Sequence, residues 1–149
     1  MSETPSDHGF VFLDHKADVY VMAFGKNLNE CFEYAAKAMF EVMTDTSKIE
    51  PLIRREVHAY GFDLFSLLYS WLEELLYLFD AEGLVFSSFN VQRISKVDEE
   101  NYVLDAVVFG EKFDPTKHER RTVVKAITYS QMKIYNEDGK FIAKFVLDI

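Results

Sequence analysis

Two short apolar runs near the start of the chain are separated by a polar segment. Residues 10–13 and 19–24 are mostly hydrophobic, and runs of this length predict β-strands. The segment between them carries Asp14, His15 and Asp18. We therefore expect a turn there that presents polar side chains at the ends of two strands.

The spacing of apolar residues becomes helical after residue 27. Asn27 is suited to cap the free N–H groups of the first turn, and Glu30 is placed to reach back as in a capping box. The Thr-Asp-Thr-Ser segment at 44–47 is expected to end this helix. The predicted buried stripe consists of Leu28, Cys31, Phe32, Ala35, Met39, Val42 and Met43.

A second helix is predicted after a short strand at residues 56–60. Gly61 precedes it, and Asp63 is its expected N-cap. The helix is apolar almost all round, which favours a central core element over a face that binds a partner. Its narrow polar strip consists of Ser66, Ser70, Glu73 and Glu74.

From residue 85 onward the pattern changes to strands. The expected strands are 89–97, 102–109, 123–129, 132–135 and 141–147. A polar loop interrupts them at 110–121, and Asp138-Gly139 is a dipeptide typical of tight hairpin turns. The whole order predicts an α+β fold, with two helices packed on a largely antiparallel β-sheet. We expect a flexible tail at residues 1–9 and a single domain at residues 10–149.

The charge of the chain argues against direct binding to nucleic acid. The 149 residues include 16 Lys and Arg against 25 Asp and Glu, a formal net charge of −9. Such a surface repels phosphate backbones, and it suits either simple solubility or a basic protein partner. Hydrophobic residues make up 49% of the chain, which is enough to build a core without disulfides or metals.

The sequence gives no indication of secretion or of a membrane span. Its single cysteine, Cys31, cannot form an internal disulfide. The first residues lack the basic and apolar regions of a secretory signal, and the richest apolar stretch is interrupted by Glu73 and Glu74. We expect a soluble protein of the cytoplasm, and also of the nucleus if its source is a eukaryote.

Carboxylates form the one concentrated chemical constellation. Asp14 and Asp18 lie beside the predicted turn, and Asp148 is followed by Ile149 at the end of the chain. Carboxylate oxygens favour Ca²⁺, Mg²⁺ or Mn²⁺ over zinc. The alternative is that the first two aspartates only cap a turn and that Asp148 is solvated. The last strand is apolar to its end, which favours a docked terminus. No nucleophile elbow or glycine-rich phosphate loop accompanies these residues.

Three motifs together resemble those of the archease family over nearly the whole chain. Residues 13–18, Leu-Asp-His-Lys-Ala-Asp, resemble the family's signature of an acidic residue followed by His-Thr-Ala-Asp. Residues 124–129, Val-Lys-Ala-Ile-Thr-Tyr, match a second block, and residues 148–149 match a terminal Asp followed by an aliphatic residue. One departure is Lys16, which stands where the family usually has Thr.

The resemblance implies an activator without a reaction of its own. Archeases stimulate the RtcB-type RNA ligase, which joins RNA ends after tRNA intron removal and uses GTP and Mn²⁺ to guanylylate its own histidine. The implied metal ligands are Asp18, Asp148 and the main-chain carboxylate of Ile149, with Asp14 as a secondary candidate. The resemblance favours Ca²⁺, with Mg²⁺ or Mn²⁺ as alternatives. The implied partner is the RtcB-type ligase or a tRNA ligase complex.

Two further residues are expected to act on the partner. Lys125 is the only charge within 123–129, and the motif match favours contact with a nucleotide phosphate or a ligase carboxylate over a plain solvent-facing lysine. His15 is expected to act in activation or to orient its loop by hydrogen bonding. Two other functions stay open: a small divalent-metal-dependent hydrolase, and a chaperone-like modulator of a tRNA-modifying methyltransferase.

Overall fold

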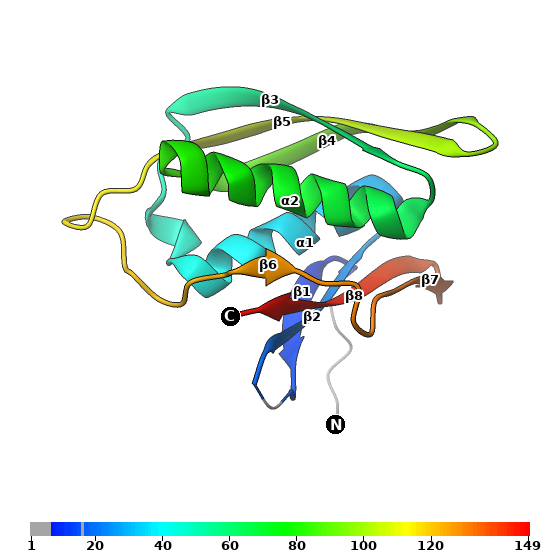
Figure 1. Ribbon diagram of the computed structural model, residues 1–149, viewed down its shortest axis with the longest axis horizontal. Coiled ribbons are helices and arrows are strands. Elements are labelled where there is room, and N and C mark those ends of the chain that lie inside the picture. Colours follow the sequence, from blue (N-terminus) through cyan, green and yellow to red (C-terminus); the bar gives the residue numbers. More distant parts are fainter. Residues whose placement is uncertain (1–6, 16) are drawn as a thin grey trace.

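The computed structural model describes residues 7–15 and 17–149, and its elements form three layers (Figure 1). A three-stranded sheet lies on one side, two α-helices lie in the middle, and a five-stranded sheet lies on the other side. All strand pairs among these residues are antiparallel. The predicted α+β fold, with two helices on antiparallel sheet, is therefore confirmed. Lys16 and residues 1–6, which make up most of the predicted tail, lie outside the described residues.

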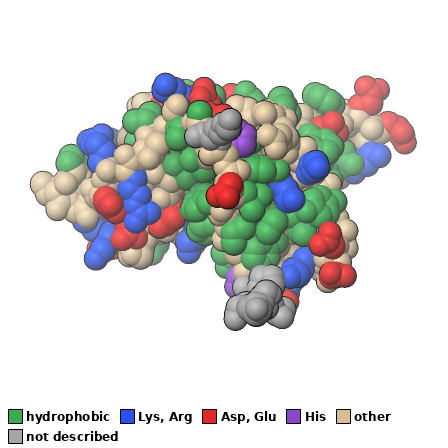
Figure 2. Space-filling model, turned by 90° about the horizontal axis from the view of Figure 1, so that it is seen from below, with side chains coloured by type: hydrophobic (Ala, Val, Ile, Leu, Met, Phe, Trp, Pro, Cys, Tyr) green, Lys and Arg blue, Asp and Glu red, His purple; other side chains and the backbone are tan. Residues whose placement is uncertain are grey.

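The five-stranded sheet has the order β1-β2-β8-β6, and β7 also pairs with β8. Its strands are β1 Gly9–Leu13, β2 Val19–Gly25, β6 Ala126–Ile127, β7 Lys133–Glu137 and β8 Lys140–Asp148. Val21 and Phe145 are fully buried and pair across β2 and β8 on the face that packs against the helices. The face seen from below also carries hydrophobic side chains at its centre, with charged residues around them (Figure 2).

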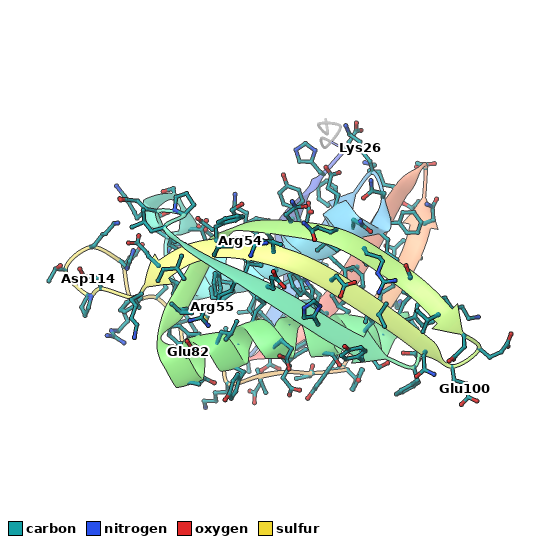
Figure 3. The ribbon with its side chains drawn as sticks, turned by 90° about the horizontal axis from the view of Figure 1, so that it is seen from above. Lys26, Arg54, Arg55, Glu82, Glu100 and Asp114 are labelled. Carbon is teal, nitrogen blue, oxygen red and sulfur yellow. The ribbon has the colours of Figure 1, made fainter. Side chains whose placement is uncertain are left out.

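The three-stranded sheet covers the second helix, α2 Leu64–Glu82. Its strands are β3 Ile53–Gly61, β4 Leu84–Asp98 and β5 Asn101–Lys112, in the order β3-β5-β4. Arg55 on β3 forms an ion pair of 2.8 Å with Glu82 in the last turn of α2 (Figure 3). This pair ties the sheet to the end of the helix. Neither α-helix in the described part of the chain is long and apolar enough to cross a membrane.

The first helix, α1 Leu28–Met43, lies between the two sheets. The backbone N–H of Glu30 donates to the side chain of Asn27 at 2.8 Å, so the predicted N-cap is confirmed. The carboxylate of Glu30 accepts from the backbone N–H of Lys26 at 2.8 Å, one residue earlier than a capping box requires. Cys31 is buried in the core, where burial raises the pKa of its thiol to about 12. It is therefore an inert core residue.

Helix α2 is a core element, as its apolar sequence predicts. Asp63 caps it and forms a reciprocal capping box with Ser66, and Gly83 ends it in the left-handed conformation, at φ +69°. Trp71 is fully buried, and its indole N–H donates to the carbonyl oxygen of Phe32 at 2.9 Å. This bond joins the two helices and satisfies the only polar atom of the tryptophan side chain.

The predicted strand at 123–129 is wrong in extent, since only Ala126–Ile127 pair in the sheet. The reason is a long-range attachment just before it. The backbone N–H groups of Arg121 and Thr122 donate to the carbonyl oxygens of Met43 and Val42, at 3.0 and 3.1 Å. The chain therefore follows the end of α1 before it reaches β8.

Several other strands are longer than predicted, and one turn is as predicted. The strand expected at 102–109 extends over Asn101–Lys112, so the polar loop expected at 110–121 begins only after Lys112. The strand expected at 56–60 extends over Ile53–Gly61, and the strand expected at 89–97 begins already at Leu84. Asp138 and Gly139 both have positive φ angles, 53° and 78°, as the predicted hairpin turn requires.

Candidate metal centre

Asp18 and Asp148 lie at adjoining ends of two neighbouring strands. Strand β2 begins at Val19, which pairs with Leu147 of β8. Asp18 directly precedes this pair and Asp148 directly follows it, so the two residues lie at the same end of two neighbouring strands. Two carboxylates gathered at one such end repel each other. A divalent cation bound between them would remove this repulsion.

The end of β8 is held from its other side by β6. Ala126 pairs with Asp148, and the backbone N–H of Lys125 donates to the carbonyl oxygen of Asp148 at 2.8 Å. Asp18, Asp148 and Ile149 are all half-buried. The two aspartates therefore lie at the ends of ordered strands, where solvent can still reach them.

The donor set suits a hard divalent cation with few protein ligands. The described residues contain no group of three or more His, Cys, Asp or Glu side chains placed to hold a metal ion. Asp14 is exposed in the same loop and does not complete such a group. A cation at this edge would therefore bind the two aspartates together with a main-chain carboxylate or water.

His15 lies between Asp18 and a turn from the far end of the sequence. Its Nδ1 is 3.8 Å from a carboxylate oxygen of Asp18, and its Nε2 is 3.2 Å from Nε2 of Gln131. Because an amide nitrogen only donates, Nε2 of the ring accepts and the ring proton resides on Nδ1, the side that faces Asp18. The ring also packs edge-on against Tyr20, with centroids 5.8 Å apart. The ring therefore lies beside the Asp18 carboxylate, at a distance too long for a hydrogen bond, and its contacts with Gln131 and Tyr20 position it there.

Gln131 contacts His15 at the candidate site, and the sequence analysis did not predict this contact. It has a φ of 54° in the turn that follows β6, and 116 residues separate it from His15. No local pattern links positions so far apart. Its positive φ, uncommon for a residue with a side chain, is the one feature that sets this turn apart, and it appears only in the structure.

Lys125 lies on the side of β6 that faces α2. Its side chain is exposed and lines a cavity of about 350 Å³, together with Glu73, Tyr77 and Asp80. It forms no ion pair or side-chain hydrogen bond with any other residue of 7–15 and 17–149. The ammonium group is therefore free to contact a partner.

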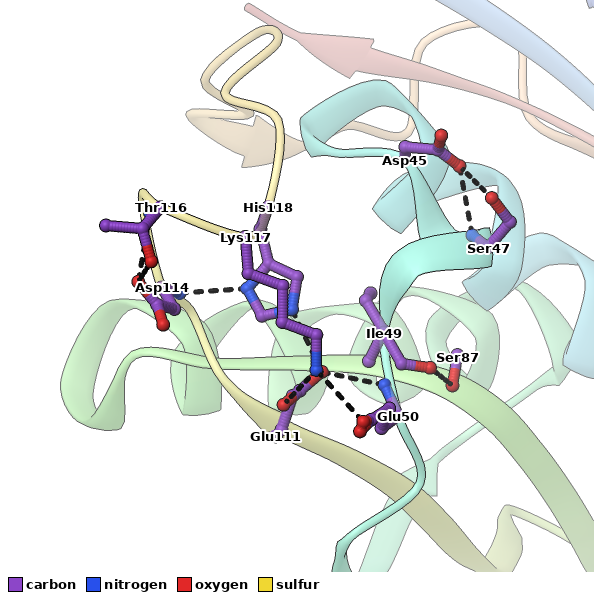
Figure 4. A network of polar contacts seen from close by, with 10 residues as sticks. All are labelled: Asp45, Ser47, Ile49, Glu50, Ser87, Glu111, Asp114, Thr116, Lys117 and His118. Atoms are coloured by element: carbon purple, nitrogen blue, oxygen red, sulfur yellow. Dashed lines mark hydrogen bonds and ion pairs between the residues drawn. The ribbon is translucent and has the colours of Figure 1, made fainter.

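A polar network fixes the loop that leads to Lys125 (Figure 4). Glu111 accepts hydrogen bonds from Lys117, at 3.0 Å, and from the backbone N–H of Glu50, at 2.7 Å. His118 is buried, accepts the backbone N–H of Asp114 at Nδ1, and so donates its Nε2–H to Glu111 at 3.0 Å. Burial alone would raise the pKa of Glu111, but these hydrogen bonds outweigh it and lower the pKa to about 2. The network is structural and holds the loop in place.

A second cavity, of about 630 Å³, opens beside Asp18. Apolar side chains that include Phe12 and Val42 line it, with Phe12 48% exposed. One wall is held rigid, because Arg121 bonds both Glu41, at 2.8 Å, and Glu119, at 2.9 Å. Asp18 therefore borders an open hollow with both apolar and charged walls.

Comparison with known protein families identifies the family of the chain. The archease protein family matches residues 10–149. The chain belongs to the archease family. The protein archease of Sulfurisphaera tokodaii is 55% identical over 140 residues, covering 94% of this chain and 98% of that relative. The protein archease of Pyrococcus furiosus is 47% identical over 137 residues, covering 91% and 95%. The family membership expected from the three motifs is thus confirmed.

Two solved structures share the fold of this archease. The solution structure of a protein from Methanobacterium thermoautotrophicum has a TM-score of 0.82 at 45% identity, covering 95% of this chain and 99% of that one. The crystal structure of an archease from Thermotoga maritima, described as a possible chaperone, has a TM-score of 0.55 at 16% identity, covering 100% and 98%. The second likeness supports the fold alone.

Proposed function

We propose that this archease is a non-catalytic activator of an RtcB-type RNA ligase in tRNA splicing, promoting its guanylylation and repeated turnover. The observation that carries the proposal is the convergence of the three family motifs. Asp18 precedes the Val19–Leu147 pair, Asp148 follows it, and Lys125 is bonded through its backbone to Asp148. Motifs far apart in the sequence therefore lie together at one end of the five-stranded sheet, which is expected if they act together.

The proposed metal ligands are Asp18, Asp148 and the main-chain carboxylate of Ile149. Ca²⁺ is the metal that family resemblance favours, and Mg²⁺ or Mn²⁺ would suit the same oxygen donors. A bound cation supplies positive charge at this edge, where it can help to order nucleotide phosphates. The ring of His15, with Nδ1 3.8 Å from a carboxylate oxygen of Asp18, would hold the loop beside that carboxylate without a hydrogen bond to it. Lys125 offers its free ammonium group to a phosphate or to a ligase carboxylate.

Charge supports a protein partner with a basic pocket. The formal net charge of −9 would speed the approach to a phosphate-binding active site and oppose direct binding to RNA. The only cysteine is a buried thiol, which suits a reducing compartment such as the cytoplasm.

The test is RNA joining by the RtcB-type ligase of the same organism, with GTP, Mn²⁺ and RNA ends in excess over enzyme. We expect repeated turnover only when the archease is present, and no joining or phosphodiester cleavage by the archease alone. Cleavage of bis-p-nitrophenyl phosphate by the archease alone would favour the hydrolase alternative. Co-purification with a tRNA methyltransferase, without any effect on the ligase, would favour the modulator alternative. Either result would overturn the proposal.

A further inference from the structure

A groove between α2 and β6 is lined by carboxylates without partners. Glu73, Glu74 and Asp80 project from α2, Lys125 lies on the opposite wall, and the buried Leu76 contributes to the floor. None of the three carboxylates forms an ion pair with another residue in the described part of the chain. Three carboxylates thus face one ammonium group, and the groove attracts positive charge.

Exposed tyrosines accompany these charges. Tyr77 lines the groove and is 61% exposed. Tyr129, just beyond β6, is 52% exposed and stacks on Tyr69 of α2, with ring centroids 4.6 Å apart and planes at 11°. Burial raises the pKa of Tyr129, and the nearby charge of Glu73 contributes to the rise. Tyrosine faces beside carboxylates form the setting that a guanidinium group prefers.

The wall opposite α2 is the edge of a sheet. Among the described strands, β6 pairs only with β8, so its other edge is unpaired. Ala126 and Ile127 of β6 line the groove directly. An unpaired strand edge offers backbone N–H and C=O groups to an added strand, a common way to bind an extended peptide.

We propose that this groove binds an extended, arginine-containing segment of the ligase. The segment lies along β6, its arginines contact Glu73, Glu74 and Asp80, and Tyr77 stacks on a guanidinium group. A carboxylate of the segment pairs with Lys125. The identity of the partner rests on the proposed function, whereas the basic character of the segment rests on the groove. A nucleic-acid occupant is disfavoured, because its phosphates would face the three carboxylates.

The first experiment reverses charge in the groove and compares it with the same change elsewhere. The double variant Glu73→Lys/Glu74→Lys alters the groove, and Glu99→Lys/Glu100→Lys alters the exposed turn of the β4–β5 hairpin (Figure 3). All four positions are exposed, so both variants should fold. We expect the groove variant to bind the ligase about tenfold more weakly by calorimetry, and the hairpin variant to bind like the parent. Equal affinity of the two variants would overturn the inference.

The second experiment measures whether the backbone amides of β6 become protected when the ligase binds. Hydrogen exchange of the amides in segment 126–127 should slow in the ligase complex of the parent protein, and less so with the groove variant. Unchanged exchange there, in a complex that forms and activates, would overturn this inference alone. A parent protein that neither binds nor stimulates the ligase would overturn the proposed function and, with it, this partner.

Discussion

The backbone N–H of Lys125 donates a hydrogen bond of 2.8 Å to the carbonyl oxygen of Asp148. Because this bond uses only main-chain atoms, it holds the two motifs together whatever their side chains are. The pairing of Val19 with Leu147 fixes the third motif in the same way. Side-chain substitutions at this edge should therefore affect function without dismantling the sheet, and the two effects can be measured separately.

Lys125→Gln should slow ligase guanylylation about tenfold, the change expected when one charged contact is lost. The midpoint of thermal unfolding should stay close to that of the parent, since the exposed side chain forms no ion pair in the described part of the chain. Lys133→Gln makes the same change at an exposed position on β7 and should leave both quantities unaltered. A large loss of stability with normal guanylylation would assign Lys125 a structural role instead.

Two residues added after Ile149 should weaken the binding of Ca²⁺ and Mn²⁺, as measured by calorimetry. The addition replaces an anionic carboxylate with a neutral carbonyl, and the number of carboxylates sets the affinity of such sites. The same residues added before Met1 serve as the control and should leave the affinity unchanged. Equal affinities of the two extended proteins would remove the terminal carboxylate from the ligand set.

Glu111→Gln should destabilise the fold by about 1–3 kcal/mol at pH 7, because Lys117 and His118 lose a charged partner. The pKa of Glu111 is lowered from 4.5 to about 2, so its contribution is complete above pH 4.5 and is lost as the pH falls toward 2. Urea unfolding should therefore show a smaller difference between variant and parent at about pH 3.5 than at pH 7. Glu99→Gln, on the exposed hairpin, should have little effect at either pH. A difference that does not vary with pH would contradict the assignment.

Gly110→Ala should be among the most damaging single substitutions. A Cβ atom at this position would lie 1.9 Å from the backbone oxygen of Val85, and a strand backbone cannot move aside easily. We expect a loss of about 4 kcal/mol or more in urea unfolding. Gly139→Ala has open space but a φ of +78°, and should cost about 1–2 kcal/mol. Similar losses at the two sites would show that the sheet yields at Gly110.

Local signals predicted the helix starts and the tight turn. Asn27 and Asp63 each bond an N–H group within three residues, and Asp138-Gly139 adopts positive φ angles by itself. Such features depend on neighbours in sequence, and pattern alone finds them. The extent of the segment at 123–129 could not be found in this way. It depends on bonds from Arg121 and Thr122 to the end of α1.

The candidate site, too, was predicted only in the part that depends on local sequence and family resemblance. Carboxylate chemistry and family resemblance selected Asp18 and Asp148, but only the pairing of β2 with β8 shows that they lie at the same end of neighbouring strands. The contact between His15 and Gln131 and the groove beside Glu73 come entirely from packing between distant segments. These residues are far apart in the sequence, so composition and spacing could not predict that they lie together.

The most direct test of the central claim is the initial rate of ligase guanylylation with Asp18→Asn in place of the parent archease. This substitution keeps the shape of the side chain and removes the negative charge of a proposed ligand. Asp138→Asn, in the hairpin turn, is the matched control, since asparagine tolerates its positive φ. We expect stimulation to fall to the level of the ligase alone with Asp18→Asn and to stay complete with Asp138→Asn. Full stimulation by Asp18→Asn would contradict the claim that the Asp18–Asp148 edge activates the ligase.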